Sequence, residues 1–324
     1  PEYYPVWGTC PSKVTFETWK LMNNNAQGNM TCIIDSLIYA FAGGGQDWWI
    51  GNETWCYNTY TNFWTRLEDM PMGMTAGGIG QVGNKIYLVA GWQNTSETDY
   101  SWITVDSILE YDMAKDTFIF RQNAPYKMGS MISCMMNDEM YLFGGIGIPG
   151  GEIYPKKSRK YNPLNEQWDL SSVPDMQYPH LMHGTAEVLN GDIYVLGGCS
   201  PGPDFTIQRT EKFDGEEWTP IAEMPVPSAL HTSVIHDNKI LVFGGDDFWS
   251  NPTSNSISLI QEYDPLTDSW RLMEPMPFRR SAMGGGKVGN FVYLSGGMLD
   301  DRDPATGVSE VWRFNLDSLQ EWCQ

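Results

Sequence analysis

Short apolar runs recur along the chain, and each ends in a pair of small residues. Six runs share this pattern: Ile38–Gly43, Ile86–Gly91, Met140–Gly145, Ile193–Gly198, Ile240–Gly245 and Val292–Gly297. Their last glycines are 48, 54, 53, 47 and 52 residues apart in turn. A short run that is apolar without alternation predicts a strand buried on both faces. The chain is therefore organised by a repeat, and repeats of this length are typical of propellers and solenoids.

A second signature follows each run. An aromatic residue precedes Asn or Asp in every unit: Tyr57–Asn58, Tyr111–Asp112, Tyr161–Asn162, Phe213–Asp214, Tyr263–Asp264 and Phe314–Asn315. Another aromatic residue follows after a turn: Trp64, Phe118, Trp168, Trp218, Trp270 and Trp322. The Asx side chains favour turns, and a Pro-bearing segment such as Met224–Pro225 leads into the next unit. Each unit thus predicts four short strands, and no stretch shows a sustained helical period.

The glycine pairs, the spaced aromatic residues and the repeat length resemble kelch repeats over essentially the whole chain. Ala42 and Ala90 replace the first glycine in the first two units. The resemblance implies an all-β fold: a six-bladed β-propeller of four-stranded kelch blades around a central channel. We expect one domain over residues 1–324, with blade repeats that end near residues 64, 118, 168, 218, 270 and 322.

Closure of the ring has two solutions. The segment Trp19–Met22 and the segment around Trp322 both fit the outer strand of the last blade. Residues 1–22 are therefore either the ring-closing strand or an N-terminal extension. A disulfide between Cys10 and Cys323 would fasten the two ends together.

Charge and glycosylation signals indicate which partners and which cellular location the protein has. The formal net charge is −20, which disfavours nucleic acid and anionic membrane surfaces as partners. No apolar run is long enough for a membrane-spanning helix. Six cysteines and three N-glycosylation sequons, at Asn29, Asn52 and Asn94, favour a secreted, extracellular protein. A start at Pro1 without a signal sequence fits a processed form.

Two sets of loops are expected to share one face of the ring: those after the glycine pairs and the Pro-bearing ones. In kelch proteins this face binds partners, and loops on a rigid scaffold commonly carry function. The candidate binding residues on it are aromatic or cationic: Trp48, Trp49, Trp92, Tyr154, Lys156, Lys157, Phe205, Phe248, Trp249, Arg279 and Arg280. Some of these aromatic side chains would instead fold back and fill gaps between blades. The sequons map to the sector of blades one and two, which would leave blades three to six open.

Two charged groups have alternative interpretations. Arg279 and Arg280 could form an anion-binding fork at the channel mouth or pair with nearby acids. Asp246, Asp247, Asp300, Asp301 and Asp303 could offer oxygens to calcium, but no EF-hand spacing is present. We predict no metal site and no cofactor.

Catalytic signatures are weak. A resemblance to galactose oxidase, a copper enzyme on this scaffold, would require converging His and Tyr ligands. His183 and His231 instead stand 14 and 13 residues before their glycine pairs, which indicates matching repeat positions. Motifs of nucleophilic hydrolases, zinc proteases and phosphate loops are missing from the sequence.

The favoured function is a non-catalytic extracellular recognition or structural module that binds a protein through its loop face. Carbohydrate binding by the same aromatic residues is one alternative. A secreted propeller enzyme, either an oxidase or a glycosidase-like enzyme, is the other, because scattered carboxylates cannot be paired from sequence. Self-association also remains open.

Overall fold

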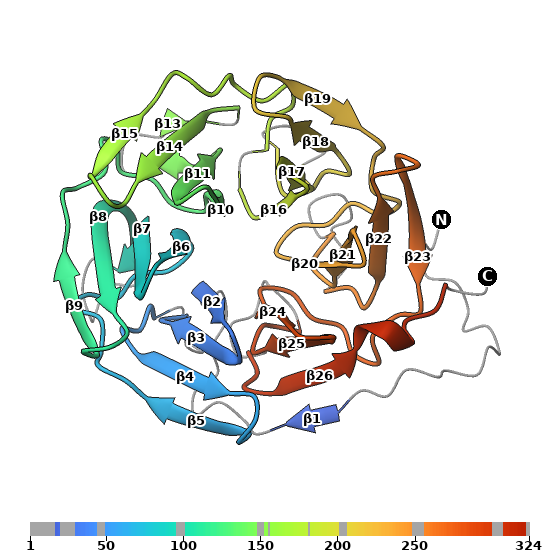
Figure 1. The fold of residues 1–324 in the computed structure, drawn as a ribbon, viewed down its shortest axis with the longest axis horizontal. Coiled ribbons are helices and arrows are strands. Elements are labelled where there is room, and N and C mark those ends of the chain that lie inside the picture. The colour runs from blue at the N-terminus through green and yellow to red at the C-terminus, as the bar shows by residue number, and fades with distance from the viewer. Residues whose placement is uncertain are drawn as a thin grey trace.

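The computed structural model shows a closed ring of six four-stranded antiparallel sheets, or blades (Figure 1). It describes residues 17–19, 30–43, 49–94, 101–147, 152–154, 156–180, 182–200, 206–247, 256–299 and 307–321. The predicted six-bladed propeller with four strands per blade is confirmed.

The two inner strands of each blade form a hairpin. The innermost strands line the channel and contact one another around the ring: β2 (Met30–Ile34), β6 (Gly78–Val82), β10 (Ile132–Met136), β16 (Thr185–Leu189), β20 (Thr232–His236) and β24 (Gly284–Val288). The second strands are the apolar runs of the repeat: β3 (Leu37–Phe41), β7 (Lys85–Asn94), β11 (Glu139–Phe143), β17 (Asp192–Leu196), β21 (Lys239–Phe243) and β25 (Phe291–Ser295). They are buried on both faces between neighbouring blades.

The two outer strands form a second hairpin. The third strands are β4 (Thr54–Asn58), β8 (Trp102–Asp112), β14 (Ser158–Asn162), β18 (Thr210–Phe213), β22 (Ile260–Asp264) and β26 (Val311–Asn315). The outermost strands are β5 (Phe63–Arg66), β9 (Thr117–Phe120), β15 (Gln167–Asp169), β19 (Trp218–Ile221), β23 (Ser269–Met273) and β1 (Glu17–Trp19). Blade three adds a short hairpin, β12 (Ile146–Gly147) with β13 (Glu152–Ile153), and a 3-10 turn, Leu316–Ser318, follows β26.

The recurring aromatic residues hold each outer hairpin together. Tyr263 on β22 lies opposite Trp270 on β23, with ring centroids 5.2 Å apart, and its hydroxyl donates to Asp268 in the turn between them. The same stack recurs in other blades, at 5.0 Å for Tyr57 with Trp64. Large aromatic rings fill the gap between sheets that diverge from the channel, which explains why an aromatic residue recurs at this place in each unit.

The N-terminal strand β1 closes the ring. It pairs antiparallel with β26, so Trp19 lies opposite Val311, and it forms the periphery of blade six (Figure 1). Glu321 instead bridges Met273 of blade five, and Trp322 lies outside the described residues. The last blade therefore combines strands from both ends of the sequence, which resists opening of the ring.

The small-residue pairs adopt backbone conformations that explain their composition. At the first position φ is positive in all six units, including Ala42 and Ala90, with values of 52° and 55°. At the second position φ is also positive, and a Cβ on Gly245 would overlap Ser228 and lie 2.6 Å from the carbonyl oxygen of Ala229. Only glycine combines this φ with so close an approach of the segment that enters the same blade.

The strand order gives the ring two unlike faces. The loop face holds the segments after the glycine pairs and the segments that enter each blade. The opposite hairpin face holds the tight turns, such as Asp237–Asn238, where two residues with positive φ connect β20 to β21. On the loop face, β7 and β8 extend past their glycine, and β12 and β13 add a further hairpin. The loop face is thus the more elaborate of the two.

Candidate functional site

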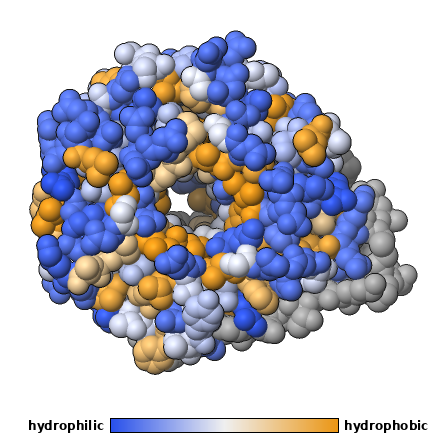
Figure 2. All heavy atoms as spheres, in the orientation of Figure 1, coloured by the Kyte–Doolittle hydropathy of each residue, from blue (hydrophilic) through white to orange (hydrophobic). Residues whose placement is uncertain are grey.

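The channel opens on the loop face through a ring of backbone contacts. Ala76, Ser130, His183, Leu230 and Ala282 stand at the same place in successive blades, and their φ values lie between 50° and 62°. The Leu230 amide donates to the His183 carbonyl at 2.8 Å, and the Ala282 amide donates to the Leu230 carbonyl at 2.8 Å. The cavity at this mouth has a volume of about 180 Å³. Figure 2 shows that the channel through the centre of the ring is open, with hydrophobic side chains around the hole.

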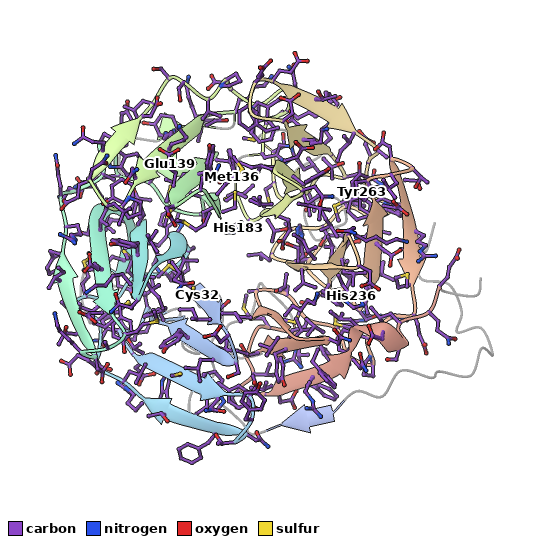
Figure 3. All side chains as sticks on the ribbon, in the orientation of Figure 1. Cys32, Met136, Glu139, His183, His236 and Tyr263 are labelled. Carbon is purple, nitrogen blue, oxygen red and sulfur yellow. The ribbon has the colours of Figure 1, made fainter. Side chains whose placement is uncertain are left out.

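Two histidines reach this cavity from different repeat positions. The strand register aligns His183 with Leu230, whereas His231 aligns with Gly184, because Thr185 and Thr232 begin the inner strands that follow. The interpretation of the two histidines as equivalent is therefore wrong by one residue. Burial lowers the pKa of each to about 4, so both rings are neutral at pH 7. His231 Nε2 lies 3.1 Å from Thr185 Oγ1, and Figure 3 places His183 at the inner edge of the ring.

A third histidine is fully buried in blade four. His180 Nδ1 lies 2.8 Å from the Gly197 carbonyl oxygen, and its Nε2 lies 3.2 Å from Glu211 Oε1. The Glu211 carboxylate also accepts the backbone amides of Gln177 and Tyr178, both at 2.7 Å. Together these contacts join the glycine pair of blade four to the segment that enters the blade.

Arg280 makes the corresponding contacts with the glycine pair and a carboxylate in blade six. It is 3 % exposed, donates from Nη1 to the Gly296 carbonyl at 3.1 Å and from Nη2 to Glu310 at 3.1 Å. Its guanidinium lies over the Phe278 ring, 5.2 Å from the centroid. Arg280 is thus engaged inside the blade, in agreement with the ion-pair alternative. Arg279 is exposed, and its carbonyl accepts a bond from Arg280 Nε.

Blade three brings two tyrosines and an arginine together. The rings of Tyr126 and Tyr154 are 5.9 Å apart, and the Arg159 guanidinium lies 4.8 Å from the Tyr154 centroid and 5.9 Å from that of Tyr126. Arg159 is 2 % exposed, whereas Tyr126 is 39 % exposed. Tyr154 comes from the loop after the glycine pair and Tyr126 from the entry segment, so the two kinds of loop meet here.

The cluster continues into blade four. Lys156 Nζ donates to the Gln177 carbonyl at 2.6 Å, and Lys157 pairs with Asp175 at 2.8 Å. The exposed Arg209 lies over the ring of Tyr178, 4.5 Å from its centroid. We define the blade three–four patch as Tyr126, Lys127, Tyr154, Lys156, Tyr178 and Arg209 with Arg159 beneath them.

Sequence reasoning found only part of this patch. It selected Tyr154 and Lys156, together with the neighbouring Lys157, and missed Tyr126, Lys127, Arg159, Tyr178 and Arg209. The position of Tyr126 could have been found from the sequence, because Tyr126 and Phe278 both follow the proline of an entry segment. Alignment of the blades at that proline would have marked this position as a recurring contact.

The remaining binding candidates divide into three groups. Trp92 is 8 % exposed and its Nε1 donates to Ser130 Oγ at 2.8 Å, so it fills a gap between blades. Trp49 is 36 % exposed. Outside the described residues lie the binding candidates Trp48, Phe205, Phe248 and Trp249, the sequon residue Asn29, and the two residues of the predicted disulfide, Cys10 and Cys323.

The two described sequons differ in accessibility. The Asn52 side chain is exposed and donates to the Met70 carbonyl at 3.0 Å. Asn94 is 9 % exposed, and its Oδ1 accepts the Ile50 amide at 2.6 Å. A glycan on Asn94 would require this contact to open.

The described cysteines are free thiols: Cys32, Cys56, Cys134 and Cys199. Burial raises the pKa of Cys32 to about 12 and that of Cys56 to about 11, which makes both thiols unreactive at neutral pH.

Two acidic groups bear on metal binding. His236, Asp237 and Asp317 meet on the hairpin face, where His236 Nε2 lies 3.1 Å from Asp317 Oδ1. Of the residues considered for calcium, Asp246 is fully buried and Asp247 is half-buried, while Asp300, Asp301 and Asp303 lie outside the described residues.

Comparison with known proteins agrees with the architecture. The Kelch motif family model matches residues 227–277. The chain is similar to kelch-like protein 25 of Xenopus tropicalis, with 22% identity over 76% of this chain and 40% of that protein. It is also similar to human kelch-like protein 23, with 26% identity over 86% of this chain and 46% of that protein. The chain spans about half the length of the curated relatives it matches.

Among solved structures, one titled "Structure of YjhT" superposes with a TM-score of 0.76 at 13% identity, over 90% of this chain and 95% of that one. This similarity supports the fold alone. Within the described part of the chain, no helix is both long and apolar enough to cross a membrane. The six blades and the matching motif together support a kelch-repeat β-propeller.

Proposed function

We propose that this chain is a non-catalytic recognition module that binds a protein partner through its loop face. The observation that carries the proposal is the blade three–four patch, where partly exposed tyrosines from two kinds of loop stack on a buried arginine. Aromatic and arginine side chains of this kind dominate the energetics of protein interfaces.

The state of the histidines supports the same proposal. His180 is committed to Gly197 and Glu211, and His231 contacts Thr185 across the blade boundary. These contacts position blades, and they leave the rings poorly placed for proton transfer to a bound substrate. The kelch-like names of the relatives are a further, general support, because kelch domains commonly bind proteins.

We further propose an extracellular setting. It is supported by the sequons and by the exposure of the Asn52 side chain on the loop face of blade one. Secretion from a eukaryotic host, followed by peptide mass mapping, would test this point. An Asn52 peptide that carries no glycan in the secreted protein would remove its main support.

Cross-linking of the native complex tests the function. The chain is immobilised, exposed to an extract of its source, and treated with an amine-reactive cross-linker. We expect partner cross-links at Lys127, Lys156 and Lys157 on the loop face. Lys115 and Lys239, on the hairpin face, are the internal control, because Lys115 is 74 % exposed and available to the reagent. Cross-links confined to the control lysines, or capture of glycans without protein, would contradict the proposal.

A further inference from the structure

In three blades a basic side chain contacts the carbonyl oxygen of the first glycine of the pair, but the three side chains differ in whether a carboxylate lies beside them. In blades three and six an arginine donates from Nη1 to the carbonyl of the first glycine of the pair: Arg159 to Gly144 at 3.0 Å and Arg280 to Gly296 at 3.1 Å. Both guanidinium groups lie over an aromatic ring of the entry segment. In blade four His180 contacts the corresponding carbonyl of Gly197.

Only two of these three groups face a carboxylate. Glu310 lies 3.1 Å from Arg280, and Glu211 lies 3.2 Å from His180. No ion pair joins Arg159 to a carboxylate of the described side chains, although Arg159 is as deeply buried as Arg280. A buried cation without an ion-pair partner is costly. Burial holds the pKa of Arg159 below its usual range, and the charge of Asp175, which makes no ion pair with Arg159, offsets this effect only in part.

The surface above Arg159 is also rich in cations. Lys127, Lys156 and Arg209 are exposed; among the described residues, Lys156 contacts a carbonyl oxygen and Arg209 a tyrosine ring. The nearby described carboxylates are already engaged, Asp175 with Lys157 and Glu211 with His180 and two backbone amides. A positive field of this kind on a chain of net charge −20 is a local exception to its electrostatics.

We propose that the blade three–four patch binds an acidic segment of the protein partner. Aspartate and glutamate carboxylates contact Lys127, Lys156 and Arg209, and the positive field of Arg159 reinforces their attraction. The exposed faces of Tyr126 and Tyr178 receive the apolar parts of the same segment. This proposal rests on the proposed function and adds the chemistry of the partner to it.

The comparison of blades also locates the segment. Blade six offers the same arginine and aromatic geometry, but Glu310 already neutralises its charge. Charge complementarity therefore favours blades three and four over blade six for an anionic ligand.

A synthetic probe tests the proposal on the complete chain. The probe is a fluorescein-labelled peptide of alternating glutamate and alanine, about ten residues long, and binding is followed by fluorescence anisotropy. Peptides with glutamine or lysine in place of glutamate are the controls for charge. The test variant is Lys127→Glu with Arg209→Glu. Lys115→Glu makes a charge change of the same kind on the hairpin face.

We expect saturable binding of the glutamate peptide alone. The double variant should weaken it by about tenfold or more, because two attractions become repulsions. Lys115→Glu should leave it unchanged, and a rise from about 50 mM to about 300 mM salt should weaken it. Equal binding of the glutamine peptide, or equal affinity of the double variant, would overturn the proposal. Tighter binding of a sulfated oligosaccharide than of the peptide would overturn the choice of a protein segment.

The native complex separates this proposal from the function on which it rests. If the double variant still captures the partner and still cross-links through the loop face, the recognition function holds and the acidic-segment proposal fails. If wild type and variant both cross-link only through the hairpin face, the recognition function itself fails.

Discussion

Replacement of Arg280 and of Arg159 by methionine should have unequal effects on stability. Methionine keeps much of the apolar volume, so the change isolates the guanidinium charge and its hydrogen bonds. Arg280→Met removes the donor to the Gly296 carbonyl and leaves the Glu310 carboxylate without its cation. Arg159→Met removes one donor, to the Gly144 carbonyl, and abolishes a buried charge that forms no ion pair with a described carboxylate.

The magnitudes follow from these contacts. Hydrogen bonds to a charged group contribute about 1.5–3 kcal/mol, and loss of one partner of a buried ion pair costs about 3–5 kcal/mol. Because Glu310 is 38 % exposed and can be hydrated, we take about 2–3 kcal/mol for Arg280→Met. For Arg159→Met the lost bond is offset by relief of the buried charge, which leaves about 1 kcal/mol or less.

Urea unfolding followed by tryptophan fluorescence measures both changes, and the 14 tryptophans give a strong signal. A double-mutant cycle with Glu310→Gln isolates the ion pair, since Arg280→Met should lower the free energy of unfolding by less when Glu310 is already replaced by a neutral residue. Equal losses for the two arginine variants would refute the reasoning. They would mean that Arg159 has an anionic partner inside the protein, and the basis for an external one would disappear.

Other predictions concern the repeat, the channel and the sequons. Gly245→Ala should destabilise by more than about 3 kcal/mol in thermal unfolding, because the new Cβ overlaps Ser228. Gly215→Ala, with a similar φ of 101° but open space around it, should cost about 1–2 kcal/mol. Burial lowers the pKa of His183 and His231 to about 4 and raises that of Glu187 to about 7. Between pH 4.5 and 6.5 the unfolded chain thus binds up to two more protons at the histidines and one fewer at the glutamate. Stability contributed by these groups should rise by about 1.4 kcal/mol per pH unit there, and His231→Gln should flatten the slope; an unchanged slope would show that His231 titrates normally. In a secreted preparation, Asn52 should carry a glycan and Asn94 should not, as read by peptide mass mapping; full occupancy at Asn94 would show that its contact with Ile50 opens before folding ends.

The fold could be predicted from the sequence because its signals are local and repeated six times. The second strands, the Asx turns and the aromatic stack each depend on residues within one unit, so the sequence order itself reveals them. Local sequence signals could not decide whether Trp19 or Trp322 lies in the strand that closes the ring. That choice depends on contact between the two ends of the chain, which no pattern within a unit specifies.

The site was harder to predict because its contacts cross between units. Glu310 lies 30 residues from Arg280, and Tyr126 lies 33 residues from Arg159, so neither pairing follows from spacing. The misalignment of His183 with His231 shows the sensitivity of such arguments, since a shift of one residue moves a side chain to a different surface. Trp92 was selected as an exposed aromatic residue, but its bond to Ser130 of the next blade holds it inside.

The central claim is that a protein partner binds the loop face, and hydrogen–deuterium exchange of the native complex tests it most directly. The account predicts protection on partner binding at residues 124–130, 156–160, 175–180 and 206–211, with unchanged exchange at the hairpin-face turns near residues 113–116 and 237–238. Protection confined to those turns, with the four loop segments unchanged, would contradict it.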